Sequence, residues 1–236
     1  MSKLASLHEL QKQNLPIVPF ALLDAENYKD QIKAFLKEQN LEKFMIRTDG
    51  KGNFSPSVVG VSFSEEVLNE VQEFFNEGYD VFVADPADKF KNFYSLNIQK
   101  EKNNIIVEIV GPGFIATDLN RHGFIHESYE LEYPNLEIIE GNQFIISPEL
   151  YEKEREEKIN ILREKETSIP EDALVFVYNT YPPFEEDKKT YVTSIIPRLV
   201  EVAKGLSKGK KEDFIASMSF LGELKQPVFW DVYVLG

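Results

Sequence analysis

Three β-rich runs follow one another between residues 79 and 110, with no helical pattern between them: Tyr79–Ala84, Phe93–Gln99 and Ile105–Val110. The dipeptide Asn103-Asn104 between the last two runs suits a tight turn. The chain closes on a second pair of runs, Asp213–Leu221 and Pro227–Leu235, around a turn at Gly222–Gln226. Strands joined by short turns pair antiparallel. With helices before and after them, they predict an α+β fold rather than an alternating βαβ series.

The spacing of apolar residues predicts five helices, at residues 3–14, 25–39, from Ser62 to Gly78, 148–166 and 190–208. Ser62 and Glu65 have the spacing of a capping box, and Pro148 suits the first position of a helix. The segment 48–60 (TDGKGNFSPSVVG) holds three glycines and a proline and is predicted to be a loop. Other short strands are expected at Phe44–Arg47, 124–132 and Ala173–Tyr178.

Composition excludes several kinds of site. The chain has no cysteine, so disulfides, thiolate metal sites and a cysteine nucleophile are ruled out. Zinc is disfavoured because His122 and His126 would share a face only in a helix, and their flanks are predicted as strand. The net charge of −14 argues against nucleic-acid and anionic-membrane partners. It does not exclude ATP, since a few cations in a cleft can hold a triphosphate.

No stretch approaches the roughly 20 apolar residues of a membrane helix. The N-terminal sequence MSKLASLHEL has no apolar core of the signal-peptide type. A chain of 236 residues with 42% hydrophobic content can bury one core, or two lobes that share a cleft. We therefore expect a soluble, cytoplasmic protein.

Four segments carry a resemblance to one family. The first is KLASLHELQKQNLPIVPF, Lys3 to Phe20, and the second is FMIRTDG, Phe44 to Gly50. They resemble parts of the ATP-binding domain of phosphoenolpyruvate synthases and pyruvate phosphate dikinases. The resemblance implies that Lys3 and Arg47 contact the nucleotide phosphates and act in catalysis, and a guanidinium can bond two phosphate oxygens. The alternatives are a disordered N-terminal lysine and an ordinary arginine at a strand end.

The loop FSPSVVG, Phe54 to Gly60, is similar to the family's small-residue loop over the phosphates. The third segment, EIVGPGFIATDLNRHGFIHESYEL, Glu108 to Leu131, is similar to the family's glycine-rich stretch, although Phe-Ile rather than Leu-Gly follows Gly113. The resemblance implies nucleotide contacts by five residues: Gly60, Glu108, Gly111, Gly113 and Glu127. The alternative for the third segment is a solvated loop.

The fourth segment is the closing hairpin, where the family has two metal or nucleotide ligands twelve positions apart. The corresponding residues are Ser219 and Asp231, which the resemblance implies as metal ligands. A serine hydroxyl is a poorer Mg²⁺ ligand than a carboxylate. Strand alternation predicts that Asp231 lies on the face opposite Trp230. The alternative is an exposed strand carboxylate.

The resemblance implies one ATP-grasp-like domain over residues 1–236, with mostly antiparallel sheets and a cleft between two lobes. The approximate lobes are residues 1–78 and 148–236, which flank 79–147. ATP and Mg²⁺ are the implied cofactors. The expected activity is an ATP-dependent phosphotransferase or carboxylate ligase, with a small molecule or a separate protein as acceptor. Two alternatives stay open: a nucleotide-binding or interaction protein that has lost catalysis, and a structural protein that binds nothing.

Overall fold

A computed structural model of the chain describes residues 2–50, 56–86, 92–111, 114, 116, 119–120, 123–142, 147–165, 183–221 and 226–236. The predicted strand Ala173–Tyr178 lies outside these residues. The chain divides into two compact units. The first comprises Met1–His8 and Ile17–Lys89, and the second comprises Glu9–Pro16 and Phe90–Gly236.

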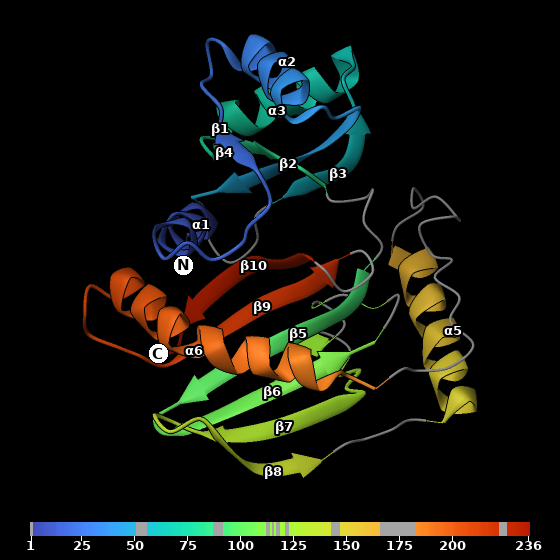
Figure 1. Cartoon of the computed structure of the whole chain (residues 1–236). Coiled ribbons are helices and arrows are strands. Elements are labelled where there is room, and N and C mark those ends of the chain that lie inside the picture. Colours follow the sequence, from blue (N-terminus) through green and yellow to red (C-terminus); the bar gives the residue numbers. More distant parts are fainter. Residues whose placement is uncertain are drawn as a thin grey trace. The chain divides into compact units, whose positions relative to one another are not determined.

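The first unit contains a four-stranded antiparallel sheet in the order β1-β4-β2-β3. Its strands are β1 (Phe20–Leu22), β2 (Lys43–Asp49), β3 (Ser57–Ser62) and β4 (Asp80–Ala84). Helices α2 (Tyr28–Gln39) and α3 (Glu65–Asn76) lie on one face of this sheet (Figure 1). The helix α1 (Lys3–Lys12) begins in the first unit and ends in the second.

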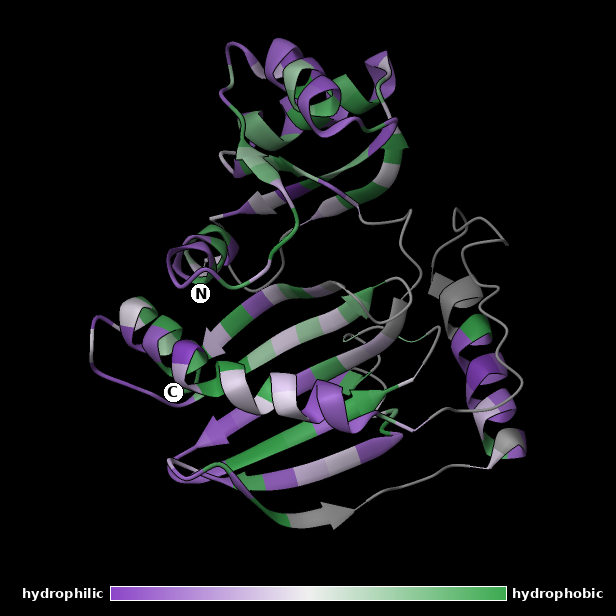
Figure 2. Ribbon diagram, in the orientation of Figure 1, coloured by the Kyte–Doolittle hydropathy of each residue, from purple (hydrophilic) through white to green (hydrophobic). Residues whose placement is uncertain are grey.

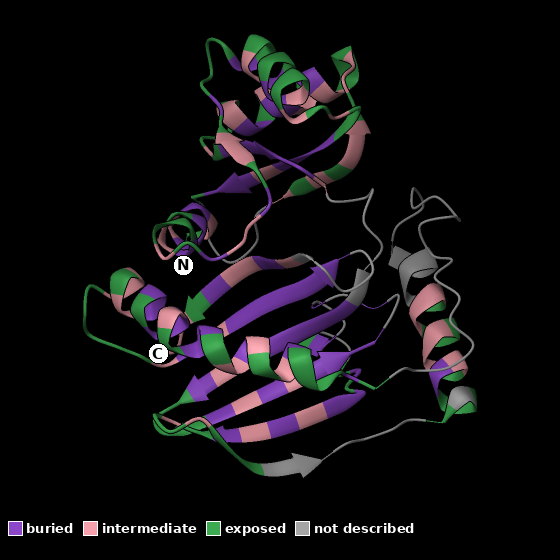
Figure 3. Ribbon diagram, viewed as in Figure 1, coloured by how far each residue is buried: buried purple, intermediate pink, exposed green. Residues whose placement is uncertain are grey.

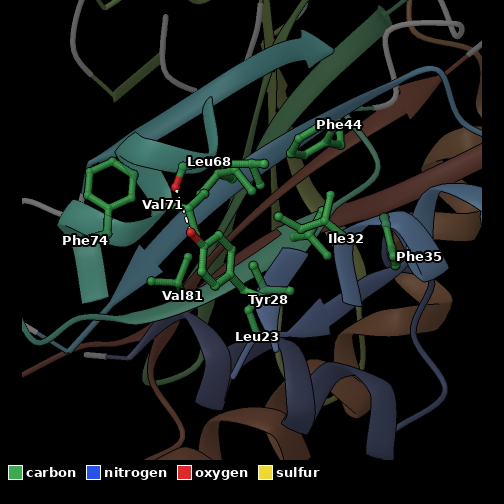
Figure 4. Packing of buried hydrophobic residues seen from close by; sticks show 11 residues of the cluster. Leu23, Tyr28, Ile32, Phe35, Phe44, Leu68, Val71, Phe74 and Val81 are labelled. Carbon is green, nitrogen blue, oxygen red and sulfur yellow. Dashed lines mark hydrogen bonds between the residues drawn. The ribbon is translucent and has the colours of Figure 1, made fainter. Parts of the chain in front are cut away.

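The core of the first unit lies between the sheet and the pair α2 and α3. Ile32 from α2, Val71 from α3 and Phe44 from β2 are each fully buried in it. Figure 4 shows these side chains in contact, with the Tyr28 hydroxyl donating to the Leu68 carbonyl at 3.2 Å. Burying one such aliphatic or aromatic side chain contributes about 1.5–3 kcal/mol. This face therefore stabilises the unit, and its residues are not candidates for a binding site.

Two local predictions in this unit were wrong. The segment 48–60 is not one loop, because β2 continues through Asp49 and β3 already begins at Ser57. The helix α3 is capped by Ser64 rather than by a box from Ser62. The Ser64 side chain accepts a hydrogen bond from the Val67 amide.

The second unit contains a six-stranded antiparallel sheet in the order β10-β9-β5-β6-β7-β8. Its strands are β5 (Asn92–Glu101), β6 (Asn104–Val110), β7 (Glu127–Glu132), β8 (Glu137–Asn142), β9 (Phe214–Leu221) and β10 (Gln226–Val234). The closing hairpin and the β5–β6 pair were predicted. The strand β8 was not, because its adjacent Ile138 and Ile139 break strict alternation.

Two helices complete the described part of the second unit. The helix α5 (Pro148–Lys165) begins at the predicted proline and is largely hydrophilic (Figure 2). The helix α6 (Glu186–Leu206) starts four residues before the predicted position and contains Pro197. It lies across one face of the six-stranded sheet (Figure 1), and the central strands β5 and β9 are buried along most of their length (Figure 3).

Candidate functional site

The two faces of the six-stranded sheet differ in chemistry. Phe220 of β9 stacks edge-on against Phe184 and Tyr191, with ring centroids 5.7 and 5.8 Å apart. Phe220 therefore marks the face covered by α6. Met218 lies two residues before Phe220 in β9 and therefore shares that face. Its partner Leu96 and the partner of Leu96, Ile109, lie there as well, and all three residues are buried. The apolar core of the unit thus lies under α6, and polar residues alternate onto the opposite face.

A polar row crosses that opposite face. Cα pairing between adjacent strands aligns the residues Asp231, Ser217, Asn97, Glu108 and Ser128. With strands about 4.8 Å apart, this row extends about 19 Å from β10 to β7. We call these five residues the polar row. A continuous line of polar side chains across five strands is unusual for a sheet face that only packs against other elements.

Hydrogen bonds order the middle of the polar row. The Ser217 hydroxyl donates to Asn97 Oδ1 at 3.1 Å, and Asn97 Nδ2 donates to Asn120 Oδ1 at 2.7 Å. Ser217 and Asn97 are both buried. The row is therefore preorganised at its centre, with a carboxylate on each side of it.

The two carboxylates of the row differ in their surroundings. Burial raises the pKa of the half-buried Glu108 above its ordinary value. Asp231 Oδ2 accepts a hydrogen bond from the Tyr233 hydroxyl at 3.1 Å, and Oδ1 is shielded from solvent. The partial desolvation of Glu108 disfavours its charged form, so a cation placed beside it would be favoured.

A β-bulge in β10 overturns one prediction about the row. Phe229 pairs with Met218 and Asp231 with Ser217, so the register shifts between them and Trp230 is the extra residue. Trp230 Nε1 donates to Ser219 Oγ at 2.8 Å, which places the indole on the face of the polar row. Trp230 and Asp231 therefore lie on the same face, not on opposite ones, because a bulge interrupts the alternation.

Ser219 is not placed as a partner of Asp231. It pairs with Val228 and is buried. Ser95 Oγ donates to the Phe114 carbonyl at 3.2 Å, so in the 2.8 Å contact between the two hydroxyls Ser219 donates to Ser95. The Ser219 hydroxyl thus both accepts from Trp230 and donates to Ser95. It supports the position of the indole, and it is poorly suited to bind a metal ion.

The glycine stretch after β6 is held by a buried histidine. The Gly111 amide donates to His126 Nδ1 at 2.9 Å, and His126 Nε2 lies 2.6 Å from Glu154 Oε2 of α5. Because Nδ1 accepts, the ring is the neutral tautomer with its proton on Nε2. The Gly111 amide therefore binds His126, which leaves it poorly placed to bind a phosphate. Gly113 lies outside the described residues.

From the sequence, His126 was a candidate only as half of a zinc pair with His122. In the structure His126 is fully buried and connects Gly111, which follows β6, to Glu154 of α5. Its ring centroid lies 4.8 Å from that of Phe114 and 5.4 Å from that of Tyr151. The signal that could have indicated this is a histidine directly after the apolar pair Phe124-Ile125 in the predicted strand 124–132.

Glu127 lies on the face covered by α6, on the other side of the sheet from Glu108. Its Oε2 accepts from the Phe184 amide at 2.9 Å, and its Oε1 lies 3.4 Å from Lys189 Nζ. These contacts fix the start of α6. On the same face, burial and the neighbouring Glu127 carboxylate raise the pKa of Tyr129. The structure thus brings Glu108 and Asp231 onto one face but does not bring Glu127 with them.

The phosphate-binding candidates Lys3 and Arg47 belong to the first unit. Arg47 lies over the Phe82 ring at 5.8 Å, and Phe82 packs against Leu4 and Leu7 of α1. Arg47 is therefore on the face of the four-stranded sheet that α1 covers, and Lys3 is the first residue of that helix.

Asp49, which sequence analysis did not single out, caps α1. Its Oδ2 accepts from the Ser2 hydroxyl at 2.5 Å and from the Leu4 amide at 2.8 Å. Burial acts to raise its pKa, but hydrogen bonds from Ser2 and from the amides of Leu4, Lys3 and Gly50 outweigh it and lower the pKa. The backbone of Lys3 is thereby fixed next to the end of β2.

Gly60 lies in β3, not in a loop. Its φ of 69° falls in the region that glycine favours, and it sits in the register shift between the pairs Ile46–Val58 and Phe44–Val61. A surface pocket of about 530 Å³ in this unit is lined by the segment just before α2, the first turns of α2, and Asn69 and Gln72 of α3. None of the candidate residues lines it.

Within the described ranges, no group of three or more His, Cys, Asp or Glu residues could enclose a metal ion. No helix in the part of the chain that the structure describes is long and apolar enough to cross a membrane.

No family model and no curated protein matches the sequence. Solved structures do match it. The Ca. Korarchaeum cryptofilum ACD1 in complex with coenzyme A is 10% identical over 97% of this chain and 89% of that chain, with a TM-score of 0.51. The D-alanine-D-alanine ligase from Coxiella burnetii is 9% identical over 97% of this chain and 45% of its own, with a TM-score of 0.48.

The macrocyclase MdnC from Microcystis aeruginosa MRC, bound with its precursor peptide MdnA, is 9% identical with a TM-score of 0.46. The comparison covers 98% of this chain and 51% of that one, so this chain spans about half the length of the macrocyclase chain. The α+β architecture with two antiparallel sheets matches ATP-grasp structures. The fold class predicted from the sequence is therefore confirmed.

Proposed function

We propose that the chain binds ATP with Mg²⁺ and that the polar row of the six-stranded sheet forms the centre of the binding surface. The observation that supports this most is the row itself, because it places two carboxylates and a preorganised amide and hydroxyl on the sheet face opposite the α6 core. The fold match supports it at the level of architecture. The four sequence segments support a closer relation to phosphoenolpyruvate synthases and pyruvate phosphate dikinases.

Asp231 and Glu108 could each supply one carboxylate ligand to a Mg²⁺ ion, but they could not bind the same ion. Asp231 and Glu108 are three strands apart in the row, about 14 Å, so they do not share one ion. Mg²⁺ is commonly held by one or two carboxylates together with substrate phosphates and water. Either carboxylate fits that arrangement, and a bound ion would neutralise phosphate charge there.

Lys3 and Arg47 are proposed as phosphate contacts of the first unit. The guanidinium of Arg47 is planar, lies over the Phe82 ring, and is of the side-chain type that can bond two phosphate oxygens. Asp49 fixes the first turn of α1, so the position of Lys3 relative to β2 is defined. Gly60 is proposed as a shape-determining residue because its positive φ permits the register shift in β3. Gly111 is proposed as a positioning residue because its amide binds His126.

The reaction proposed is an ATP-dependent ligation or phosphoryl transfer to an unidentified acceptor, a small molecule or a separate protein. Such reactions depend mostly on positioning and on electrostatic stabilisation of the phosphoryl group. The second candidate is a nucleotide-binding protein without turnover. The involvement of Ser219 in an internal hydrogen-bond chain favours it, because the second expected metal ligand is then missing.

A thermal-shift assay with nucleotides tests the proposal. ATP with Mg²⁺ should raise the melting temperature, since binding to the folded state alone contributes about 2.7 kcal/mol at 100-fold excess over Kd. Glu108→Gln and Asp231→Asn should each reduce the shift, and Glu132→Gln, an exposed carboxylate on β7, should not. Release of ADP or phosphate in the same mixtures separates the enzyme from the binding protein. If neither ATP nor ADP shifts the parent protein at millimolar concentration, the proposal is wrong.

A further inference from the structure

The single tryptophan of the chain occupies a special position beside the polar row. Trp230 is the extra residue of the β10 bulge, and the bulge turns it onto the same face as its neighbour Asp231. Bulges commonly re-aim a side chain next to a functional site. Without the bulge, alternation would direct one of these two side chains into the α6 core.

A series of hydrogen bonds through Ser219 of β9 and Ser95 of β5 fixes the orientation of the indole. Trp230 Nε1–H donates to Ser219, which donates to Ser95, which donates to the Phe114 carbonyl. An indole has one hydrogen-bond donor and no acceptor, so the bond to Ser219 uses the whole hydrogen-bonding capacity of the Trp230 side chain. The ring is partly exposed. What it can offer a ligand is therefore its aromatic face.

We propose that Trp230 stacks on the base of the bound nucleotide, so that the base lies at the β10 end of the polar row and the phosphates with their metal ion lie toward Glu108. This inference rests on the proposed function. A rigid aromatic platform suits a planar base, and stacking is attractive for any base because every base has a π-face. The half-buried Glu108 carboxylate lies three strands away, and a cation beside it would favour its charged form.

In this arrangement Asp231 lies close to the sugar rather than to the metal. Its carboxylate can accept hydrogen bonds from ribose hydroxyls, as acidic residues do in other nucleotide sites. The Tyr233 hydroxyl, bonded to Asp231 Oδ2, holds the carboxylate in place. The polar row thus has a direction, with its base end at β10 and its phosphate end at β6.

Because Trp230 is the only tryptophan, the fluorescence of the unmodified protein reports on this position alone. ATP with Mg²⁺ should change its emission saturably, with the same midpoint as binding measured by calorimetry. Tripolyphosphate with Mg²⁺, which has no base, should bind and leave the emission unchanged. If calorimetry detects ATP binding while the emission stays constant, the stacking inference is wrong and the proposed function stands. If calorimetry detects no ATP binding, both are wrong.

Variants give an independent reading. Trp230→Leu should weaken ATP binding roughly 5- to 150-fold and leave tripolyphosphate binding unchanged. Trp230→Phe, which keeps an aromatic face, should lose less. Glu108→Gln should remove the Mg²⁺ dependence of ATP binding, whereas Asp231→Asn should weaken binding but keep that dependence. Equal ATP affinity in the parent and Trp230→Leu, or Mg²⁺ dependence lost in Asp231→Asn instead, would overturn the proposed direction.

Discussion

The substitution Asp49→Asn should destabilise the first unit at neutral pH. The carboxylate receives the Ser2 hydroxyl and the amides of Lys3, Leu4 and Gly50. Asparagine keeps one acceptor oxygen but turns an NH₂ group toward donors, so at least one buried amide loses its partner. Loss of a helix cap costs about 0.5–2 kcal/mol and an unsatisfied buried donor about 1–3 kcal/mol. Since these overlap, we expect a total of about 1–3 kcal/mol.

The pH dependence of that loss identifies the mechanism. The folded-state pKa of Asp49 is lowered, so its stabilisation is present above the unfolded pKa, ordinarily 3.8, and is lost as the pH falls through the folded value. Urea unfolding should therefore show a gap between parent and Asp49→Asn at neutral pH that narrows well below 3.8. Hydrogen exchange at the Leu4 amide should accelerate in the variant.

A matched control is Asp30→Asn, which changes an exposed carboxylate in the first turn of α2. It should cost only a few tenths of a kcal/mol, as expected for an exposed charge near a helix terminus. A gap for Asp49→Asn that is absent at neutral pH, or equally large at low pH, would refute the capping argument.

Three further substitutions separate structure from binding. Glu127→Gln should destabilise the second unit by about 1–3 kcal/mol, by urea unfolding, because it weakens the contacts that fix Phe184 and the start of α6, while ATP affinity stays unchanged. Tyr129→Phe should leave the urea midpoint unchanged or raise it, since the buried hydroxyl has no hydrogen-bond partner among the described residues; a clear loss would show that it has one. Arg47→Ala should weaken ATP binding in calorimetry by about 1.5–3 kcal/mol with little effect on unfolding. If Arg47→Ala bound ATP with the affinity of the parent, Arg47 would not be a phosphate contact.

Sequence patterns predicted the sheets because each strand buries one face. In β5, Leu96 and Ile98 alternate with Asn97 and Gln99, and in β6, Val107 and Ile109 flank Glu108. This period corresponds in the structure to the two faces of β5 and β6. The strand β8 lacks that period, so only its pairing with β7 reveals it. Edge strands exchange fewer contacts, which leaves their sequence less constrained.

The candidate site was only partly accessible from the sequence. Glu108 and Asp231 were named as separate candidates, but the polar row that joins them depends on the register of four strand pairs. A bulge leaves no mark in the spacing of residues, so alternation misplaced Trp230. The pairing of His126 with Gly111 is likewise a contact across fifteen residues that no local pattern specifies.

Isothermal titration of ATP with Mg²⁺ into the parent protein and into the double variant Glu108→Gln/Asp231→Asn tests directly whether the polar row binds the nucleotide. The two residues lie on one face of the sheet and outside the core under α6, so the double variant should fold with the melting behaviour of the parent. Binding to the parent should be saturable, and the affinity should fall at least tenfold, about 1.4 kcal/mol, in the double variant. Equal affinity in both proteins would contradict the claim that the polar row binds the nucleotide.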